Sequence, residues 1–497
     1  MKISLTPGRT QQQASGTNIL LLCLLGGLAL FFGGGAVFLP TRLVLVLFAT
    51  LLSIPGMFVI ILKPSIGVWL IGLTVPFERL SLPVSLGPID ISLKSVTIVT
   101  AVMFLCAFSI TLVRQKLGKW LFAWILLPMA ILITSFISSA VASRDPADSL
   151  ESWTFRVFLV SLCFLIPLGL NSSQSAKRTT YFVLASAVLM SGYGLYQLGA
   201  LKLSLPDLKL GVQFGENYGI AKITSFQANP NPFAGYLATV ICLTLALILY
   251  RMKRGLGRRG PVLLACLALF VGTFLLTMSR SGMLGLFCGL LTLAAIYPSY
   301  FLDRRIFSGL FVFALLGVGL LFLTAPGQLI LAQLFSRTEL ATSSSRWHLE
   351  FARGAIQMIR DRPVLGWGVN QYTPVFLSDY SAYAFLTSAN THSMYLTILV
   401  ESGVVGLLPH VLLFFFIAGR GRRALRIAKP GSILHFLLAG LLAGFVSIWV
   451  GNIFYDYYFN EFVWFHFGFL LAVIKLVLTG QVLAETSIED MCIGDQL

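Results

Sequence analysis

Apolar runs of about 20 residues recur along almost the whole chain, and this feature constrains the fold more than any other. A bilayer core is about 30 Å thick, so a helix that crosses it needs roughly 20 consecutive apolar residues. Only 11% of the residues are charged, whereas a soluble domain carries about 25%. We find no segment that alternates with the period of two expected of a membrane β-strand. The sequence therefore predicts an all-α polytopic membrane protein.

The apolar runs predict about 12–14 transmembrane helices. The first run is long, Gly-rich and followed directly by a second one, so we interpret it as a span and not as a cleaved signal peptide. Three runs (65–77, 157–170 and 282–298) are short enough to belong to tilted or re-entrant helices. The complete set of candidate spans is 19–38, 43–62, 65–77, 93–113, 120–141, 157–170, 181–200, 232–250, 261–279, 282–298, 306–325, 393–418, 432–452 and 462–479.

The positions of Lys and Arg predict the orientation of the chain. If the N-terminus is cytoplasmic, 20 of the 35 basic residues lie in short cytoplasmic segments, in agreement with the positive-inside bias. The chain is then divided into a cytoplasmic segment 1–18, transmembrane helices 19–325, a long outer loop 326–392, transmembrane helices 393–479 and a cytoplasmic tail 480–497.

The net charge of +16 does not indicate a nucleic-acid partner. The basic clusters at 251–259 and 420–429 directly flank apolar spans, where such clusters fix topology and lie against anionic lipid head groups. The expected partner of these charges is the lipid bilayer. The seven cysteines show no CxxC or Cys/His ligand spacing, so the sequence predicts no disulfide framework, no metal site and no cofactor.

With this topology, a doubled Asn-Pro motif enters one span from the outer side. It consists of Asn229, Pro230, Asn231 and Pro232. Each proline biases the preceding residue away from the helical conformation. A plain helix entry explains this motif by itself, and a contribution of Asn229 and Asn231 to a site is the alternative.

Arg280 lies in a tight connection between two spans on the outer side, within Ser279-Arg280-Ser281-Gly282. An arginine at a helix end often extends to the interface without any further role. Positive charge normally avoids this face, however, and an arginine near membrane depth is commonly functional. We therefore favour a functional role.

The long outer loop contains a predicted amphipathic helix that begins near Arg346 and ends at Asp361-Arg362-Pro363. Its apolar face is formed by Trp347, Phe351, Ala355, Met358 and Ile359, and another face by Arg346, Arg353 and Arg360. Such a helix can lie at the membrane surface with its arginines on phospholipid head groups. Alternatively, its guanidinium groups can bind a phosphate-bearing substrate. The spacing alone does not decide between these interpretations.

His392 differs from the other four histidines because it lies at an outer membrane boundary among Asn390, Thr391, Ser393 and Tyr395. A neutral imidazole there can accept a proton from a hydroxyl group. A structural histidine is the alternative. We assign no role to His348, which belongs to the amphipathic helix.

These motifs, taken together and in this order, resemble the O-antigen ligase and polymerase superfamily of bacterial membrane glycosyltransferases. The resemblance covers about residues 220 to 420 closely. In one position the chain departs from the family, which commonly has Asn after the histidine, where this chain has Ser393. The motifs are Asn229-Pro230-Asn231-Pro232-Phe233, Ser279-Arg280-Ser281-Gly282, Arg346 with Phe351, Pro363-x-x-Gly366-x-Gly368, His392-x-x-Tyr395-Leu396 and Glu401-x-Gly403-x-x-Gly406.

The resemblance implies a metal-independent inverting glycosyltransferase in the bacterial cytoplasmic membrane. Arg280 and Arg346 would hold the diphosphate of a polyprenyl-linked saccharide donor, and His392 would activate the hydroxyl of a glycan or lipid-glycan acceptor. The donor would then be polymerised or ligated on the outer side of the membrane. A protein O-glycosylating enzyme would look similar at these motifs, and we favour a polymerase or ligase of surface polysaccharide. Supporting roles fall to Asn229, Asn231, Trp347, Arg353, Tyr395 and Glu401.

Two other function classes remain open from the sequence. A solute transporter, such as a bicarbonate carrier of the same superfamily, should carry ionisable residues near the bilayer midplane. The interiors of the predicted spans are almost bare of such groups, which favours an enzyme. An inactive scaffold of a polysaccharide export complex would make the arginines dispensable.

Reporter fusions test the predicted topology. Fusions within 251–260 and 419–430 should report the cytosol, because these segments carry the basic clusters. A fusion at Asn370 should report the outer side. A cytosolic signal at Asn370 would contradict the topology and, with it, every assignment to the outer face.

Overall fold

The computed structural model describes residues 60, 63–77, 81–86, 89–94, 119–202, 213–214, 221–227, 229–255, 257, 259–301, 343–381 and 388–480. The predicted spans 19–38 and 306–325, most of 43–62 and 93–113, and nearly all of the predicted tail 480–497 lie outside these residues. Residues Lys63–Leu497 form one compact unit by their contacts. The helices and sheets described below all belong to this unit.

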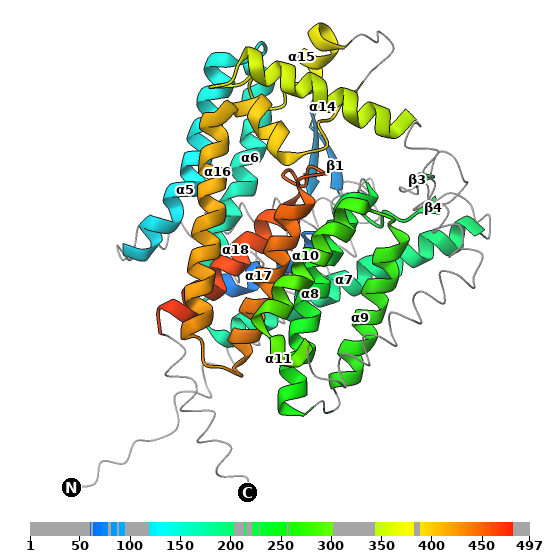
Figure 1. Cartoon of the computed structure of the whole chain (residues 1–497), viewed down its shortest axis with the longest axis vertical. Coiled ribbons are helices and arrows are strands. Elements are labelled where there is room, and N and C mark those ends of the chain that lie inside the picture. The colour runs from blue at the N-terminus through cyan, green and yellow to red at the C-terminus, as the bar shows by residue number, and fades with distance from the viewer. Residues whose placement is uncertain are drawn as a thin grey trace, which may run out of the picture. The chain divides into compact units, whose positions relative to one another are not determined.

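The described part of the chain is almost entirely helical, as predicted (Figure 1). In chain order, the helices are α3 (Pro64–Thr74), α5 (Lys119–Ile137), the π-helical turn η1 (Ser138–Ala142), α6 (Pro146–Gly169), α7 (Ser173–Lys202), α8 (Pro230–Arg254), α9 (Arg259–Leu276), α10 (Arg280–Ile296), α11 (Pro298–Phe301), α14 (Ser343–Asp361), α15 (Tyr372–Val375), the π-helical turn η3 (Phe376–Tyr380), α16 (Met394–Ile427), α17 (Ile433–Gly451) and α18 (Glu461–Leu478).

Eight of the described helices are long and apolar enough to cross a membrane. This confirms a multi-pass membrane protein. The predicted short span 157–170 is wrong, because α6 begins at Pro146 and has 24 residues. Asp145 caps α6 by accepting hydrogen bonds from the N–H groups of Ala147 and Asp148, and Pro146 suits the first turn of a helix. The first three turns of α6 contain polar residues, so hydropathy alone does not show that the helix has 24 residues.

Helix α17 lies against α8, α10 and α18, and α6 packs on α18 (Figure 1). Small residues make these approaches close. A Cβ atom on Gly285 of α10 would lie 2.5 Å from the carbonyl oxygen of Ser447 in α17. On Gly440 of α17 it would lie 2.8 Å from Cβ of Ala246 in α8. Close backbone approach at small residues is a common basis of helix association in membranes.

Helix α16 is broken at Gly403, whose φ of 64° lies in the left-handed region. The break exposes backbone groups, and the segment that follows α14 pairs with them. The N–H groups of Trp367 and Gly368 donate to the carbonyl oxygens of Val400 (2.8 Å) and Glu401 (2.9 Å). The N–H of Val404 donates to the carbonyl of Pro363 at 2.9 Å. The predicted Pro-x-x-Gly-x-Gly and Glu-x-Gly motifs therefore form one backbone junction.

Glycine is required on both sides of this junction. A Cβ atom on Gly403 would overlap the carbonyl oxygen of Val364, and one on Gly366 would overlap the carbonyl of Val400. The φ of Gly366 is 70°, which is also left-handed. Side chains are excluded here both by space and by backbone conformation.

The amphipathic helix is confirmed as α14, which ends at Asp361 as predicted. All five residues of its predicted apolar face belong to one cluster of buried and partly buried side chains, together with Trp367, Phe376 and Val400. Arg353 and Arg360 lie on its exposed face. The cluster attaches α14 to the junction at one end of the helix bundle.

Two short antiparallel ladders interrupt the helical order. Strand β1 (Ser81–Leu86) pairs with β2 (Ile89–Lys94), and β3 (Gln213–Phe214) pairs with β4 (Ala221–Lys222). The expectation that no segment alternates with period two was wrong for β1 and β2. Their alternation covers only six residues in each strand, too few to stand out beside spans of about 20.

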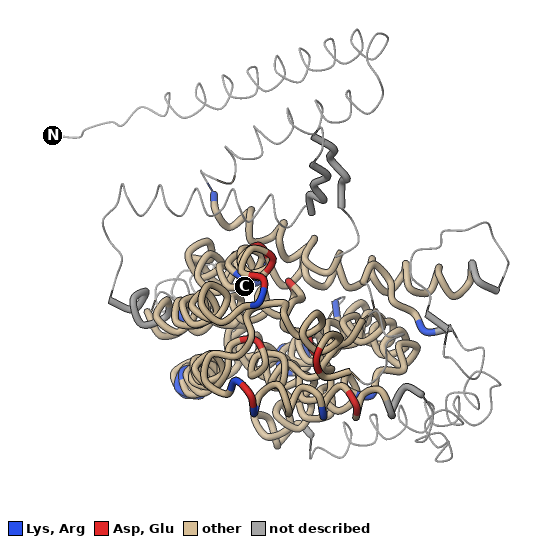
Figure 2. The backbone as a smooth tube through the Cα atoms, turned by 90° about the horizontal axis from the view of Figure 1, so that it is seen from above, with Lys and Arg blue, Asp and Glu red and all other residues tan. Residues whose placement is uncertain are grey.

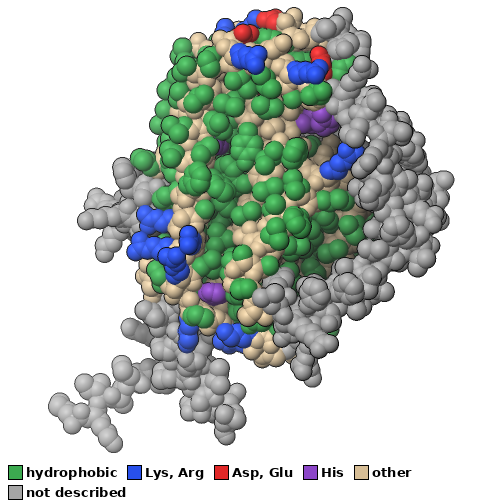
Figure 3. Space-filling model, in the orientation of Figure 1, with side chains coloured by type: hydrophobic (Ala, Val, Ile, Leu, Met, Phe, Trp, Pro, Cys, Tyr) green, Lys and Arg blue, Asp and Glu red, His purple; other side chains and the backbone are tan. Residues whose placement is uncertain are grey.

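Charged residues are sparse along the helices, as the view from above shows (Figure 2). On the face in Figure 3, a broad apolar band separates two ends, and the visible acidic side chains lie at the end that carries α14. The interiors of the helices are nevertheless not bare, which corrects the prediction. Arg156, Glu401, Glu461 and Lys475 are buried. Arg156 was missed because the predicted span 157–170 begins after it, whereas Glu401 and Lys475 lie inside the predicted spans 393–418 and 462–479.

The junction at Gly403 generates a stability prediction. Gly403→Ala should lower the free energy of unfolding by roughly 2–5 kcal/mol, because a left-handed alanine and an overlap with the Val364 carbonyl both cost energy. Gly419→Ala is the matched control in the same helix, since its Cβ would meet nothing within 4 Å. Thermal unfolding of the purified protein in detergent measures both. A Gly403→Ala protein as stable as the wild type would contradict the role of the junction.

Candidate functional site

His392 lies two residues before the start of α16 at Met394. Its φ of 52° is in the left-handed region, which a histidine rarely adopts. Its backbone N–H donates to Oδ1 of Asn390 at 2.8 Å, which is the Asx turn that favours such a conformation. Strained backbone of this kind costs roughly 1–3 kcal/mol and is concentrated at functional sites.

The imidazole of His392 is held in an aromatic environment. It stacks on His348 of α14 with 3.8 Å between the ring centroids. The rings of Phe351 and Tyr455 follow at 6.3 Å and 6.2 Å. The sequence assigned no role to His348, and α14 places this residue directly on His392.

Burial, followed by the neighbouring His348, lowers the pKa of His392 to about 4. The ring is therefore neutral near pH 7 and able to accept a proton. Its Nδ1 atom is buried and has no hydrogen-bond partner among the described residues. Burial also lowers the pKa of His348, and the positive charge of Arg280 lowers it further. This effect places Arg280 in the electrostatic environment of His348, the imidazole that stacks on His392.

Arg280 is the exposed first residue of α10. Ser279 caps this helix by accepting a hydrogen bond from the N–H of Gly282 at 3.2 Å, and its hydroxyl donates to Oδ1 of Asn231 at 2.6 Å. Asn229 in turn caps α8 and accepts from the N–H of Asn231. The two motifs that the sequence predicted on one face are therefore joined by a direct hydrogen bond.

The segment between α17 and α18 connects these motifs to His392, and the sequence motifs did not reveal it. Tyr457 lies 3.0 Å from the hydroxyl of Ser281. The ring centroids of Tyr455 and Tyr457 are 5.1 Å apart, and the ring of Tyr455 also faces His392. The signal in the sequence was a run of five aromatic residues and an aspartate within 453–459, between two spans on the predicted outer side.

Asp456 is a further ionisable group at this place. Its Oδ2 accepts a hydrogen bond from Thr397 at 2.6 Å, and the hydroxyl of Thr397 lies 2.6 Å from that of Thr391, the neighbour of His392. Burial raises the pKa of Asp456 to about 6. The hydroxyl of Tyr395 donates to the carbonyl of Trp449 at 2.9 Å. Tyr395 therefore fixes the start of α16 against α17.

Glu401 forms a buried ion pair that the sequence did not reveal. Its Oε2 lies 2.5 Å from Nη2 of Arg156 in α6, and the two side chains are 3% and 1% exposed. Its Oε1 accepts a hydrogen bond from the N–H of Asn370 at 2.8 Å. The guanidinium of Arg156 also lies over the ring of Tyr458, 4.9 Å from its centroid. Glu401 is thus bonded within the protein, and its supporting role in the site stays a prediction.

Three further predicted site residues, Arg346, Trp347 and Arg353, belong to α14. The backbone of Arg346 belongs to α14, but its side chain lies outside the described part of the structure. Trp347 stacks on Phe351 at 6.0 Å. Arg353 is exposed and lies 3.9 Å from Glu350 of the same helix. Arg353 is therefore paired on the face of α14 that is turned away from the apolar cluster.

Helices α8, α10, α16 and α18 all begin at this end of the bundle, where His392 and Arg280 lie. Helix N-termini carry partial positive charge and favour anions. Among the described residues, no group of three or more His, Cys, Asp or Glu side chains is arranged to hold a metal ion. The arrangement is suited to binding an anionic group beside a neutral imidazole.

The buried ion pair generates a prediction. Glu401→Ala should lower the free energy of unfolding by about 3–5 kcal/mol, because it leaves the charge of Arg156 buried without its partner. The double change Arg156→Met with Glu401→Leu should recover most of this loss. Glu350→Ala, which removes the exposed pair with Arg353, should cost less than about 1 kcal/mol. A double variant as unstable as Glu401→Ala in thermal unfolding would show that the pair is not the cause.

Residues 264–411 match the family model described as O-antigen ligase. The matched segment begins in α9 and ends in α16, and it contains Arg280, Arg346, His392 and Glu401. The Asn-Pro motif at 229–232 precedes it. A search of curated proteins gave no match. The family match confirms the predicted resemblance to the O-antigen ligase and polymerase superfamily over residues 264–411 of this chain.

Proposed function

We propose that the chain is a membrane glycosyltransferase that transfers saccharide from a polyprenyl-diphosphate carrier to a glycan or lipid-glycan acceptor. One observation carries the proposal: the neutral imidazole of His392, with an unpaired buried nitrogen, stacks on His348, whose pKa the positive charge of Arg280 lowers. The match of residues 264–411 to the family model described as O-antigen ligase supports this chemistry at the level of the family.

In the proposed reaction, His392 accepts the proton of the acceptor hydroxyl. The hydroxyl oxygen attacks the anomeric carbon of the donor, and the bond between this carbon and the diphosphate oxygen breaks. The electron pair leaves with the polyprenyl diphosphate, and attack from the opposite side inverts the anomeric centre. General base assistance of this kind typically contributes about 10²–10⁴-fold to the rate.

Arg280 and Arg346 hold the donor diphosphate in this proposal. Negative charge develops on the diphosphate as the sugar–phosphate bond breaks, and fixed guanidinium groups stabilise it without a metal ion. The N-termini of α8 and α10, joined by the hydrogen bond between Ser279 and Asn231, add partial positive charge nearby. Arg280 is exposed, so its fork is free to meet a substrate group.

The bound diphosphate should also adjust the base. An anion near an imidazole favours the protonated ring and raises its pKa. His392 therefore becomes a stronger base when the donor is present than in the free protein, where burial and His348 keep its pKa at about 4. Substrate binding and proton transfer are thereby linked through charge.

We place the reaction on the outer side of a bacterial cytoplasmic membrane, with the N-terminus inside. The distribution of Lys and Arg among the loops supports this orientation. The lipid part of the donor can remain in the bilayer while its saccharide occupies the end of the bundle below α14. Polymerisation of the units and ligation to a lipid-glycan use the same step and differ only in the acceptor.

The buried charges do not favour the transporter hypothesis. Arg156 is paired with Glu401, and Nζ of Lys475 donates to the carbonyl of Pro167 at 2.7 Å and to Oδ1 of Asn171 at 3.1 Å. These groups are bonded within the protein, whereas a carrier uses such groups along its substrate pathway.

The proposed diphosphate clamp predicts the effect of conservative substitutions. Arg280→Lys and Arg346→Lys should each reduce kcat/KM by about 10–100-fold, because a lysine point charge cannot reproduce the two parallel hydrogen bonds of the guanidinium fork. Transfer from a polyprenyl-diphosphate saccharide by the purified protein in vesicles measures this.

Arg353→Lys is the matched control on α14, because Arg353 is exposed and paired with Glu350. It should change kcat/KM less than twofold or threefold, roughly the effect of an exposed pair. Full activity of both Arg280→Lys and Arg346→Lys at normal protein levels would reject the clamp.

The two ionisable groups at the site predict different pH profiles. The value of kcat/KM reports the free enzyme. With His392 as the base, kcat/KM should fall only as the pH drops through about 4, since above this pH the imidazole is neutral. Asp456 as the base would instead give a fall near pH 6. The value of kcat should fall at a higher pH than kcat/KM does, because the bound diphosphate raises the pKa of His392.

His348→Phe tests the assignment of this profile. The substitution keeps an aromatic ring stacked on His392. It removes the imidazole of His348, whose presence lowers the pKa of His392, so the pKa of His392 should rise. The fall of kcat/KM should therefore move to higher pH. The alternative outcome is a fall of kcat/KM near pH 6 that is unchanged in His348→Phe and absent in Asp456→Asn. This outcome would assign the base to Asp456.

A further inference from the structure

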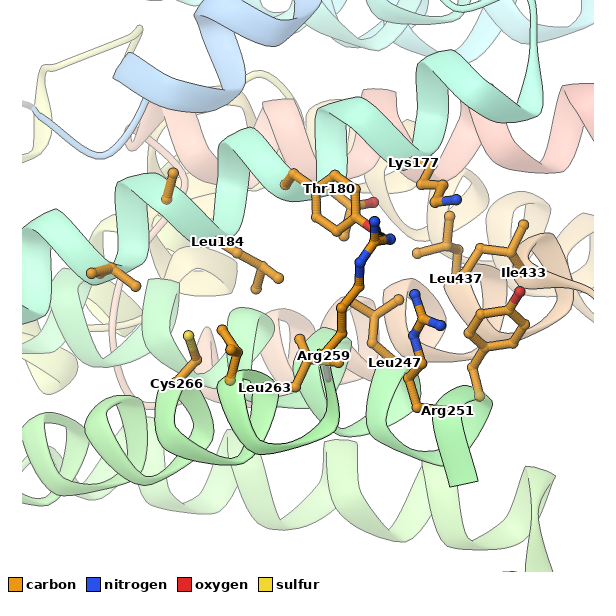
Figure 4. A pocket seen from close by; sticks show the side chains of 15 residues that line it. Lys177, Thr180, Leu184, Leu247, Arg251, Arg259, Leu263, Cys266, Ile433 and Leu437 are labelled. Carbon is orange, nitrogen blue, oxygen red and sulfur yellow. Dashed lines mark hydrogen bonds between the residues drawn. The ribbon is translucent and has the colours of Figure 1, made fainter. Parts of the chain in front are cut away.

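A second cavity lies at the opposite end of the helices that form the His392 site. It has a volume of about 300 Å³ and is lined by α7, α8, α9 and α17 (Figure 4). Arg251 lies in the last turn of α8, whose first turn contains Asn231. Arg259 begins α9, and Ile433 begins α17. The 20 residues between Asn231 and Arg251 separate the two sites by roughly 30 Å along α8.

Three basic side chains define one part of this cavity. They are Lys177 of α7, Arg251 of α8 and Arg259 of α9, and no acidic residue in the described part of the chain lines the cavity with them. Their charged ends turn toward the same part of the cavity in Figure 4. The ion pairs among the described residues involve Arg144, Arg156 and Arg353 and none of these three. Three converging cations without a carboxylate favour an anionic ligand.

The rest of the cavity is apolar. Leu184 lies seven residues after Lys177 in α7, and Cys266 lies seven residues after Arg259 in α9. Seven residues of helix correspond to roughly 10 Å, so the apolar wall begins below the basic end and continues toward the middle of the bundle. Leu437 of α17 closes the cavity on another side and is fully buried.

All four lining helices are candidate membrane spans, and the basic residues lie near their ends. This is the level at which lipid head groups meet a transmembrane protein. Val262, which lines the cavity from α9, is 61% exposed, so the cavity is open to the surroundings of that helix. A ligand can therefore enter from the bilayer.

We propose that this cavity binds an anionic phospholipid from the leaflet opposite the His392 site. Lys177, Arg251 and Arg259 hold its phosphate, and an acyl chain lies between α7, α9 and α17. The three charges and the apolar wall match the two parts of such a molecule. Basic residues whose only role is to fix the topology require no cavity. A substitution that fills the cavity but keeps the charges therefore distinguishes lipid binding from a topological role.

Native mass spectrometry of the full chain in detergent tests the proposal, with phosphatidylglycerol and phosphatidylcholine as the two probes. The wild type should retain phosphatidylglycerol in preference to phosphatidylcholine. Each basic residue near a membrane surface contributes about fivefold to the binding of anionic lipid. The triple variant Lys177→Gln, Arg251→Gln, Arg259→Gln should therefore lose a preference on the order of 100-fold.

Two matched controls accompany this variant. The variant Arg422→Gln, Arg423→Gln, Lys429→Gln also removes three charges at the same end of the bundle. These charges are exposed and lie outside the cavity, so this variant should keep the preference. Cys266→Trp fills the cavity without changing a charge and should lose the bound lipid. Leu291→Trp, on an exposed position of α10, should retain it. Gel filtration and thermal unfolding check that each variant is folded.

Several results would overturn the proposal. These are equal retention of the two lipids by the wild type, an unchanged preference in the triple Gln variant of the cavity, and unchanged retention in a folded Cys266→Trp protein. A loss in the Arg422, Arg423 and Lys429 variant as large as in the cavity variant would assign the preference to the general basic surface. It would overturn the proposal as well.

Discussion

The break in α16 at Gly403 is the constraint on which the functional end of the molecule depends. A helix that stops and restarts inside a membrane protein exposes backbone groups that lipid cannot satisfy. Here the segment 363–368 supplies the missing partners, and the buried pair of Arg156 with Glu401 connects the same junction to α6. Because Glu401 also accepts a hydrogen bond from Asn370, one side chain fixes α6, α16 and the segment behind α14. The apolar face of α14 is seated on this junction, and His348 of α14 is thereby brought onto His392.

The sequence predicted what depends on local periodicity. Trp347, Phe351 and Met358 recur at helical spacing, so the apolar face of α14 follows from the order of its residues alone. Likewise, the alternation of spans placed the Asn-Pro motif and Arg280 on one side, and Ser279 does contact Asn231. A contact between residues far apart in the sequence produces no periodic pattern that could predict it. Arg156 and Glu401, which form the buried ion pair, are 245 residues apart. The aromatic segment around Tyr455 and Tyr457 was overlooked because it contains no histidine or arginine.

The site differs from an ordinary cluster of polar residues in how it controls charge. Burial keeps His392 neutral and unpaired at Nδ1, while the cationic group of Arg280 is left exposed. A donor diphosphate would enter this arrangement as the missing anion and would raise the basicity of the imidazole at the same time. At the opposite end of the same helices, Lys177, Arg251 and Arg259 surround a cavity with apolar walls. In the proposed account, the two ends present anion sites of different kinds to the two sides of the bilayer.

The most direct measurement of the central claim is single-turnover transfer by the purified chain in vesicles, with a polyprenyl-diphosphate saccharide and its acceptor. The account predicts that His392→Ala binds the donor as the wild type does and transfers it about 10²–10⁴-fold more slowly. His435→Ala serves as the control, because His435 is hydrogen-bonded to Tyr297 at the other end of α17. Transfer by the His392→Ala protein at the wild-type rate would contradict the account, since the imidazole would then have no part in activating the acceptor.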